Sequence, residues 1–220
     1  MDHIIAHGDE LPPFDYQCPL LSLPLAFKTV LSTIPSTSSY ILSSREQILR
    51  WKTHLGEVTK PRIGLVWSGS TTHKNDQNRS LSLSQILPYL SSDYEYISLQ
   101  KEIRDIDKDA LTEGVTIKHF GDGLRDFTDT AVLCELMDIV ISVDSSVAHL
   151  AGALGKPTWI LLPFNPDWRW LLDRDDSPWY SSVKLYRQPN IGDWKSVLEK
   201  VYSDLSKVNS FSGCVVPPKK

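Results

Sequence analysis

The stretch Ile139-Val-Ile-Ser-Val-Asp-Ser-Ser-Val-Ala-His-Leu-Ala151 predicts the fold of this chain more directly than any other segment. Its apolar first half, from Ile139 to Val143, is typical of a buried β-strand, and the residues after Asp144 follow a helical pattern. A strand that runs straight into a helix leaves backbone N–H groups pointing beyond the strand's carboxyl end. Because the positive end of the helix dipole lies behind them, the junction predicts a phosphate site.

A helix cap without any ligand is the alternative interpretation of this junction. Asp or Ser after a strand often serves only to cap the next helix, which contributes about 1 kcal/mol. His149 falls about one turn into the helix, at i+3 from Ser146, so its ring is able to approach the same ligand. A lone helical histidine is nevertheless more often structural than catalytic. The junction alone therefore leaves both interpretations open.

Strands and helices alternate on both sides of the junction. Apolar runs predict five further strands, at 62–67, 95–99, 115–120, 157–162 and 183–186. Helical patterns predict the other helices, at 45–55, 82–90, 105–112, 128–137 and 193–208. This alternation predicts an α/β fold, a Rossmann-like parallel sheet with helices on both faces. Ligands of such sheets bind beyond the carboxyl ends of the strands.

The helix boundaries carry their own signals. Ser44-Arg-Glu-Gln47 has the pattern of a capping box for the helix 45–55, which Gly56 is expected to end. Ser82 is expected to open the helix 82–90, in which Pro88 is a strained position. Thr128 is expected near the N-cap of the helix 128–137.

Composition excludes several classes of protein. With 220 residues, 41% hydrophobic and 23% charged, the chain is typical of a soluble globular protein. A net charge of −4 argues against a nucleic-acid partner. No apolar run is long enough for a membrane span, and no signal peptide is visible. Cys18, Cys134 and Cys214 are widely spaced, which indicates reduced thiols in a cytoplasmic protein and no metal site.

Three loops are expected to meet the junction at the same edge of the sheet. The first, 68–80, offers Gly69 for close backbone approach, and its Lys74 and Arg79 are able to neutralise a phosphate. The second begins with Gln100 and Lys101, and the third runs over 121–127 and ends on an aromatic ring suited to a base. The first is not a Walker loop, because no Gly-Lys-Ser/Thr follows the strand at the required spacing. A solvated polar loop and plain turns are the alternatives.

The order and spacing of several short motifs resemble one known domain, the carboxyl-terminal, donor-binding half of GT-B glycosyltransferases. Two longer blocks are similar to the heptosyltransferase-like domains attached to tetratricopeptide repeats in bacterial proteins. The resemblance covers roughly residues 8–205. The motifs and blocks are Ile63-Gly-Leu-Val-Trp67 with Ser68-Gly69, Arg79-Ser80, Ser98-Leu-Gln-Lys101, Asp144–Ala153, Gly155-Lys-Pro157, Phe14–Pro24, Pro166–Tyr180 and Leu185–Gln188.

This resemblance implies that a nucleotide-diphosphate sugar binds between two Rossmann-like domains, without a metal or other cofactor. Ser145 and Ser146 would hold the diphosphate with His149 close by, and Asp144 would face the sugar or ribose. The family usually has Thr-Gly where this chain has Ser145-Ser146. The implied donor-binding residues are Ser68, Gly69, Arg79, Gln100, Asp144, Ser145, Ser146 and His149.

The resemblance also implies that much of a complete enzyme is missing. Residues 1–60 match only the end of the amino-terminal GT-B domain and the connecting helix. Residues 61–208 form the Rossmann-like domain, and 209–220 a flexible tail. The acceptor site and usually the catalytic base lie in the amino-terminal domain of the family. No catalytic base is therefore assigned, and no tetratricopeptide repeat is visible.

Two hypotheses follow from the sequence. In the first, the chain is the donor half of a hexosyl- or heptosyltransferase that needs further sequence or a partner domain for activity. In the second, it is a non-catalytic nucleotide-binding or protein-interaction module. Its exposed cleft face, including residues 11–27, would then bind a partner or associate with itself.

Overall fold

The computed structural model describes residues 4–36, 38–112 and 117–208. It groups the chain into two compact units, Met1–Pro35 and Ser36–Lys220, which are described separately. The expected tail 209–220, with Cys214, lies outside the described residues. Within the described part, no helix combines the length and the apolar character needed to cross a bilayer.

The first unit is the expected irregular amino-terminal segment. Its helices are single turns, namely η1 (Leu20–Ser22), α1 (Leu23–Ala26) and η2 (Leu31–Thr33). Pro24 lies in the first turn of α1, where a missing backbone N–H costs nothing. No residue of these three helices is buried. The described residues of this unit therefore form short local turns rather than a packed core.

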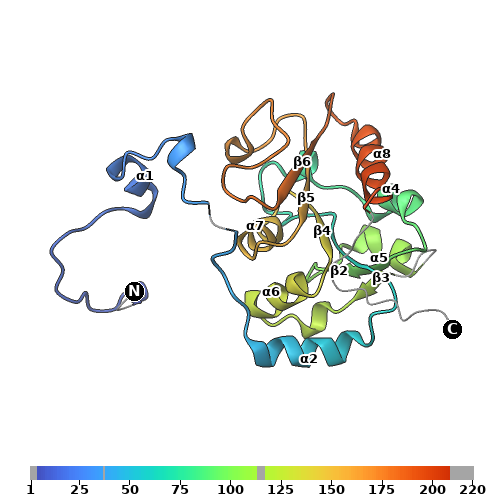
Figure 1. The fold of residues 1–220 in the computed structure, drawn as a ribbon, viewed down its shortest axis with the longest axis horizontal. Coiled ribbons are helices and arrows are strands. Elements are labelled where there is room, and N and C mark those ends of the chain that lie inside the picture. The colour runs from blue at the N-terminus through green and yellow to red at the C-terminus, as the bar shows by residue number, and fades with distance from the viewer. Residues whose placement is uncertain (1–3, 37, 113–116, 209–220) are drawn as a thin grey trace. The chain divides into compact units, whose positions relative to one another are not determined.

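The second unit contains a six-stranded sheet in which every pair of neighbouring strands is parallel, as the sequence predicts (Figure 1). The strand order is β3-β2-β1-β4-β5-β6. Because β1 has β2 on one side and β4 on the other, the strand order reverses between β1 and β4, where ligands of such sheets bind. The strands are β1 (Arg62–Val66), β2 (Glu95–Ser98), β3 (Ile117–His119), β4 (Ile139–Val143), β5 (Thr158–Leu162) and β6 (Val183–Arg187).

Helices cover both faces of the sheet (Figure 1). One group, in which α6 packs against both other helices, consists of α2 (Arg45–Leu55), α6 (Phe127–Glu135) and α7 (Ser146–Ala153). The other group consists of α4 (Leu83–Ile86), η3 (Leu87–Tyr89), α5 (Asp105–Thr112) and α8 (Trp194–Leu205). Short turns lie in the loops, at α3 (Asp76–Arg79), η4 (Gly121–Gly123) and η5 (Trp168–Trp170).

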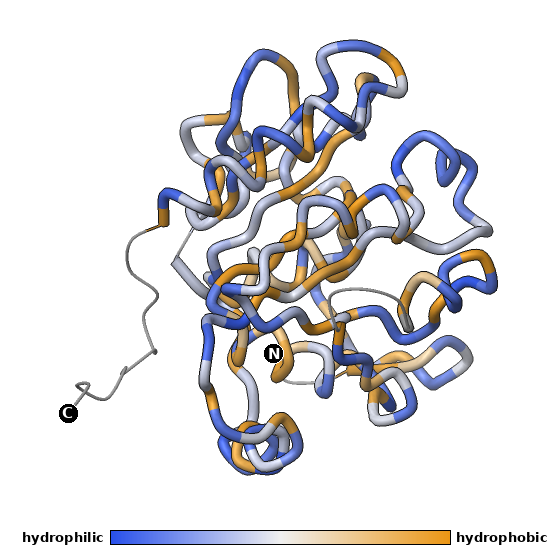
Figure 2. Tube along the Cα trace, turned by 90° about the vertical axis from the view of Figure 1, so that its right-hand side faces the viewer, coloured by the Kyte–Doolittle hydropathy of each residue, from blue (hydrophilic) through white to orange (hydrophobic). Residues whose placement is uncertain are grey.

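The core of this unit lies between the sheet and the helices. Every residue of β1, β4 and β5 is buried, because central parallel strands have both faces covered. Hydrophobic residues accordingly follow the central strands in Figure 2. Trp51 and Leu55 of α2 belong to the same core. The helix α2 reaches this core by packing against α6.

Of two expected helix starts, the structure contradicts the cap of the first and confirms Thr128 near the N-cap of the second. The capping box at Ser44 is wrong, because the Ser44 side chain makes no cap hydrogen bond and the Gln47 amide donates instead to Thr128 Oγ1 at 2.9 Å. The N-cap of α6 is Asp126, whose carboxylate accepts from the Thr128 N–H at 2.9 Å. At the start of α2, contact with α6 thus replaces local capping.

The helix expected at 82–90 is shorter than the sequence pattern predicts. Ser82 opens it, and the Gln85 side chain accepts from the Ser82 N–H at 3.0 Å. The α-helix ends at Ile86 and continues as a 3₁₀ turn that contains Pro88. Proline lacks the backbone N–H that an α-helical turn needs at this position.

Candidate functional site

A cavity of about 760 Å³ opens at the carboxyl edge of the sheet, a size typical of small-molecule sites. Four segments that are far apart in the sequence line it. They are the loop after β1, the loop after β2, the loop that leads into α6, and the first turn of α7. All three loops that the sequence places at this edge therefore contribute to one cavity together with the β4–α7 junction.

Two glycines allow these segments to approach one another closely. A Cβ atom on Gly121 would lie 2.1 Å from the backbone oxygen of Lys101, so the second and third loops pack directly. A Cβ atom on Gly69 would lie 2.3 Å from Nη2 of Arg79. Gly121 therefore needs to lack a side chain because it meets backbone, whereas a side chain at position 69 would force the Arg79 guanidinium to shift.

The first turn of α7 presents its backbone N–H groups to the cavity. Ser145, the N-cap residue, is extended, but its hydroxyl is hydrogen-bonded to the Ser142 hydroxyl at 3.1 Å and makes no cap bond. The first N–H groups of a helix have no intrahelical partner. Ser145, Ser146 and Val147 line the cavity, so these donors and the positive end of the helix dipole lie at its wall.

The described lining carries more positive than negative side chains. This excess contrasts with the net charge of −4 of the whole chain. One of the carboxylates, that of Asp126, already accepts from both the N–H and the hydroxyl of Thr128. The cavity thus suits an anionic ligand. The charged residues of the lining are Arg79, Lys101, Arg104 and Arg125, against Glu102 and Asp126.

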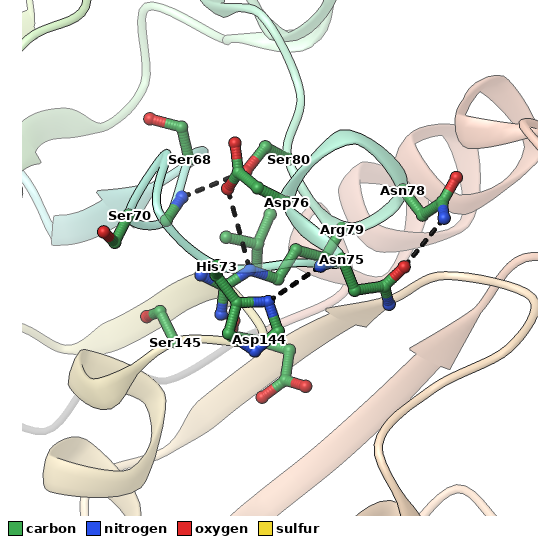
Figure 3. Close-up of polar contacts among 12 residues, drawn as sticks. Ser68, Ser70, His73, Asn75, Asp76, Asn78, Arg79, Ser80, Asp144 and Ser145 are labelled. Atoms are coloured by element: carbon green, nitrogen blue, oxygen red, sulfur yellow. Dashed lines mark hydrogen bonds and ion pairs between the residues drawn. The ribbon is translucent and has the colours of Figure 1, made fainter.

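Arg79 joins the loop after β1 to the β4–α7 junction (Figure 3). Its Nη1 donates to the backbone oxygen of Asp144 at 2.7 Å, and its Nε lies 3.7 Å from Asp76 Oδ1. Asp76 is fixed in turn by Arg104, whose Nη2 donates to Asp76 Oδ2 and to the Gly69 oxygen, both at 2.7 Å. Arg79 is therefore a brace of the cavity wall as well as a cation beside it.

Gln100 also holds the cavity together. Its Oε1 accepts from the backbone N–H groups of Trp67 and Ser68, at 2.8 and 3.0 Å, and its Nε2 donates to the Glu102 oxygen at 3.2 Å. The side chain ties the end of β1 to the loop after β2. Its buried amide is already hydrogen-bonded to the protein at both ends.

Six of the eight residues that the sequence assigns to the donor line this cavity, and two do not. Asp144 and His149 are absent from its lining. Figure 3 shows the Asp144 carboxylate pointing away from the Ser145 side chain, toward the other side of the junction. Donor contacts by Asp144 and His149 stay predictions. The six lining residues are Ser68, Gly69, Arg79, Gln100, Ser145 and Ser146.

His149 lies in an aromatic cluster on that other side. Its ring stacks on Trp170 with centroids 4.9 Å apart, and its Nδ1 is hydrogen-bonded to the Tyr180 hydroxyl at 3.1 Å. Its Nε2 lies 4.0 Å from Asp144 Oδ1. Burial lowers the pKa of His149 and outweighs the opposing effect of the Asp144 carboxylate. The ring is therefore neutral at pH 7.

Sequence reasoning missed two arginines of the cavity. Arg104 and Arg125 follow the second and third expected strands, but neither belongs to a motif that separates a ligand from a solvated loop. The only sequence feature that points to a ligand role for them is their position after the carboxyl end of a strand. Among the described residues, no cluster of three histidine, cysteine or acidic side chains is placed to hold a metal ion.

The fold and the cavity define a Rossmann-like α/β unit with an anion-suited site at the point where its strand order reverses. A similar solved structure is the ADP-heptose LPS heptosyltransferase II of E. coli. The TM-score is 0.50 at 12% sequence identity, over 77% of this chain and 54% of that chain. The second unit therefore has a heptosyltransferase-like fold, consistent with one half of a GT-B protein.

Among curated proteins, Protein FlbA of Caulobacter vibrioides is 23% identical to this chain over 205 residues. The match covers 87% of this chain and 33% of FlbA, so the chain spans about a third of the length of that relative. No family model matches the chain.

Proposed function

We propose that the cavity binds the nucleoside diphosphate of a nucleotide sugar, and that this chain is the donor-binding part of a metal-independent glycosyltransferase. The observation that carries the proposal is the first turn of α7. Its N–H groups lack a side-chain cap and lie at the wall of a cavity with four cationic side chains. Backbone donors at a helix N-terminus are a recurrent diphosphate site.

The remainder of the cavity suits the nucleoside. Leu124 and Phe127 line it as well, and Phe127 is 59% exposed, so its ring is accessible to a base. In this proposal the diphosphate lies between α7 and the loop after β1. The same N–H groups and cations stabilise the negative charge that develops on the diphosphate when the sugar leaves.

The proposal assigns no catalytic base to this chain. Transfer needs an acceptor hydroxyl and a base held in contact with the donor sugar. We propose that further sequence or a partner domain supplies them, and that the chain works with a hexosyl or heptosyl donor in the cytoplasm. This part rests on the heptosyltransferase-like fold and on the fraction of both relatives that the chain spans.

Calorimetric titration with ADP, UDP and GDP tests the proposal. At least one of them is expected to bind saturably with 1 mM EDTA present as without it, and the matching nucleoside is expected to bind much more weakly. Affinity is expected to fall as salt rises, because the contacts are ionic. If none of the three diphosphates binds, the proposal is wrong for this chain. If EDTA abolishes binding, the metal-independent part is wrong.

The second candidate function is a non-catalytic binding or interaction module. It is favoured by the apolar side chains of the first unit, where Leu21 and Phe27 are 90% and 77% exposed. Light scattering on the full chain distinguishes the candidates. Self-association without any nucleotide binding would favour the interaction module over the donor-binding role.

A further inference from the structure

Arg125 lines the cavity, and its side chain is anchored at Nε although it is 65% exposed. Its Nε donates to Asp129 Oδ2 at 3.1 Å, and its backbone N–H donates to the same oxygen at 3.2 Å. Within the part of the chain that the structure describes, neither terminal nitrogen of Arg125 has a protein partner. The inner nitrogen is thus anchored, and the forked end stays available to a ligand.

Asp129 is an anchor with no exposed side-chain surface. On the side away from Arg125, its Oδ1 accepts from Trp51 Nε1 at 3.0 Å and forms an ion pair with Arg50. Burial raises the pKa of the Asp129 carboxyl, but hydrogen bonds from Trp51 and Arg125 outweigh it and leave the pKa below its ordinary value. The carboxylate is therefore charged at neutral pH.

Two arginines pair with the buried Asp129 carboxylate, and the Asp126 carboxylate lies close enough to interact with it electrostatically. Arg50 comes from α2 and does not line the cavity, whereas Arg125 does. The terminal nitrogens of Arg125 are therefore accessible to a ligand, next to the edge of the cavity that Leu124 and Phe127 form.

We propose that Asp129 is a positioning residue that presents the terminal nitrogens of Arg125 to the anionic group of the bound ligand, with α2 as its support. Arginine suits this task because its fork binds two phosphate oxygens at once. The inference rests on the proposed function, since it takes the ligand to be a nucleoside diphosphate. On the opposite side of the carboxylate, Trp51 of α2 holds Oδ1 in place through its Nε1–H.

Paired arginine variants test the role of Arg125. The probe is whichever of ADP, UDP and GDP binds the wild-type chain most tightly. Arg125→Ala is expected to weaken binding about tenfold, the lower end for a charged hydrogen bond because the side chain is partly exposed. Arg125→Lys is expected to weaken it nearly as much, because one ammonium cannot bond Asp129 and present a fork.

Arg50→Ala is the matched control, because it removes the other ion pair of the same carboxylate outside the cavity. It is expected to leave the dissociation constant within about twofold of the wild-type value. Equal affinity of Arg125→Ala and wild type would overturn this inference alone. Absence of any nucleotide binding by the wild-type chain would overturn the proposed function as well.

A double-mutant cycle tests whether Asp129 acts through Arg125. Asp129→Asn is expected to weaken binding about fivefold in the wild-type background and to have no further effect in Arg125→Ala. If Asp129→Asn fails to fold, as judged by thermal melting, Asp129→Glu serves in the same cycle, since its longer side chain displaces the Arg125 anchor. An equal loss in both backgrounds indicates a merely structural carboxylate and overturns the positioning role.

Discussion

The two sides of the β4–α7 junction differ in almost every physical respect. One side is the cavity, where backbone donors, hydroxyls and cations face solvent. The other is the aromatic cluster, where His149 stacks on the fully buried Trp170 and bonds to Tyr180. The difference shows that a single short motif supplies residues to two environments. We expect substitutions on the cavity side to change binding, and substitutions on the aromatic side to change stability.

The largest expected effect lies on the aromatic side. Trp170 is 0% exposed and packs with Ala148 and Ile160 in the smaller core cluster. Trp170→Ala is expected to lower the free energy of unfolding by about 3–5 kcal/mol, because it removes a large buried side chain and leaves a cavity. Urea denaturation measures the loss, and Trp170→Phe is the milder control. A stable Trp170→Ala variant that no longer binds nucleotide would place Trp170 in the binding site instead.

The next effect belongs to the cavity side. Ser146 is exposed at the first position of α7, so Ser146→Asp places a carboxylate beside the proposed diphosphate. We expect nucleotide affinity to fall about 100-fold, or about 2.7 kcal/mol, through charge repulsion. Stability is expected to be unchanged or to rise by up to about 1 kcal/mol, because acidic residues favour helix N-termini.

Ser146→Ala is the control for that substitution and is expected to bind nearly as well as the wild-type chain. Calorimetry and thermal melting on the same samples separate affinity from stability. A simultaneous loss of both in Ser146→Asp would mean that the first turn of α7 is a structural element rather than an anion site.

Gly69→Ala disturbs Arg79, whose side chain joins the loop after β1 to the β4–α7 junction. The new Cβ atom would meet the Arg79 guanidinium, which then has to release the Asp144 oxygen. We expect a loss of about 1–2 kcal/mol in the free energy of unfolding together with weaker nucleotide binding. Ser70→Ala, in the same loop and exposed, is expected to leave stability unchanged. Wild-type stability of Gly69→Ala would show that Arg79 moves aside at no cost.

The smallest expected effect is a pH dependence of the aromatic side. Burial lowers the pKa of His149 from the ordinary value of 6.5, so the unfolded chain takes up this proton before the folded chain does. The contribution of neutral His149 to the free energy of unfolding is therefore fully present above pH 6.5. It is lost as the pH falls from 6.5 through the folded-state pKa. His119 has a lowered pKa for the same reason and adds to the loss.

Comparison with His149→Asn isolates the part of this pH-dependent loss of stability that His149 causes. Between pH 7 and pH 5, the wild-type chain is expected to lose up to about 1 kcal/mol more than the variant, a value reduced by the partial exposure of the ring. Urea denaturation at several pH values measures it. Parallel pH profiles of the two proteins would show that the His149 proton does not contribute.

Much of the fold could be predicted because its signals are local. Five of the strands begin and end within one residue of their expected bounds. The remaining strand, β3, ends one residue early, and the first two residues of its expected range lie outside the described residues. The capping box at Ser44 failed because the partner of Gln47 is Thr128, which lies 81 residues away. No local pattern reports such a partner.

The candidate site was predicted in part for the same reason. Ser145 and Ser146 were found from the strand-to-helix junction alone, whereas Arg125 was missed because it matters only through its distance from α7 and its bond to Asp129. Gln100 was found by its motif, but its hydrogen bonds to Trp67 and Ser68 emerge only when β1 and β2 lie side by side.

The sequence by itself determined the parallel α/β architecture and the place of the ligand edge, because hydrophobic periodicity and helix-start signals depend on neighbours in the chain. Only the tertiary structure decided which side of the β4–α7 junction each residue faces, and that Asp144 and His149 lie apart from the cavity that Ser145 and Ser146 line. It also decided that three distant segments supply the cations of one cavity. Such convergence depends on how the loops close in space, and no local sequence pattern encodes it.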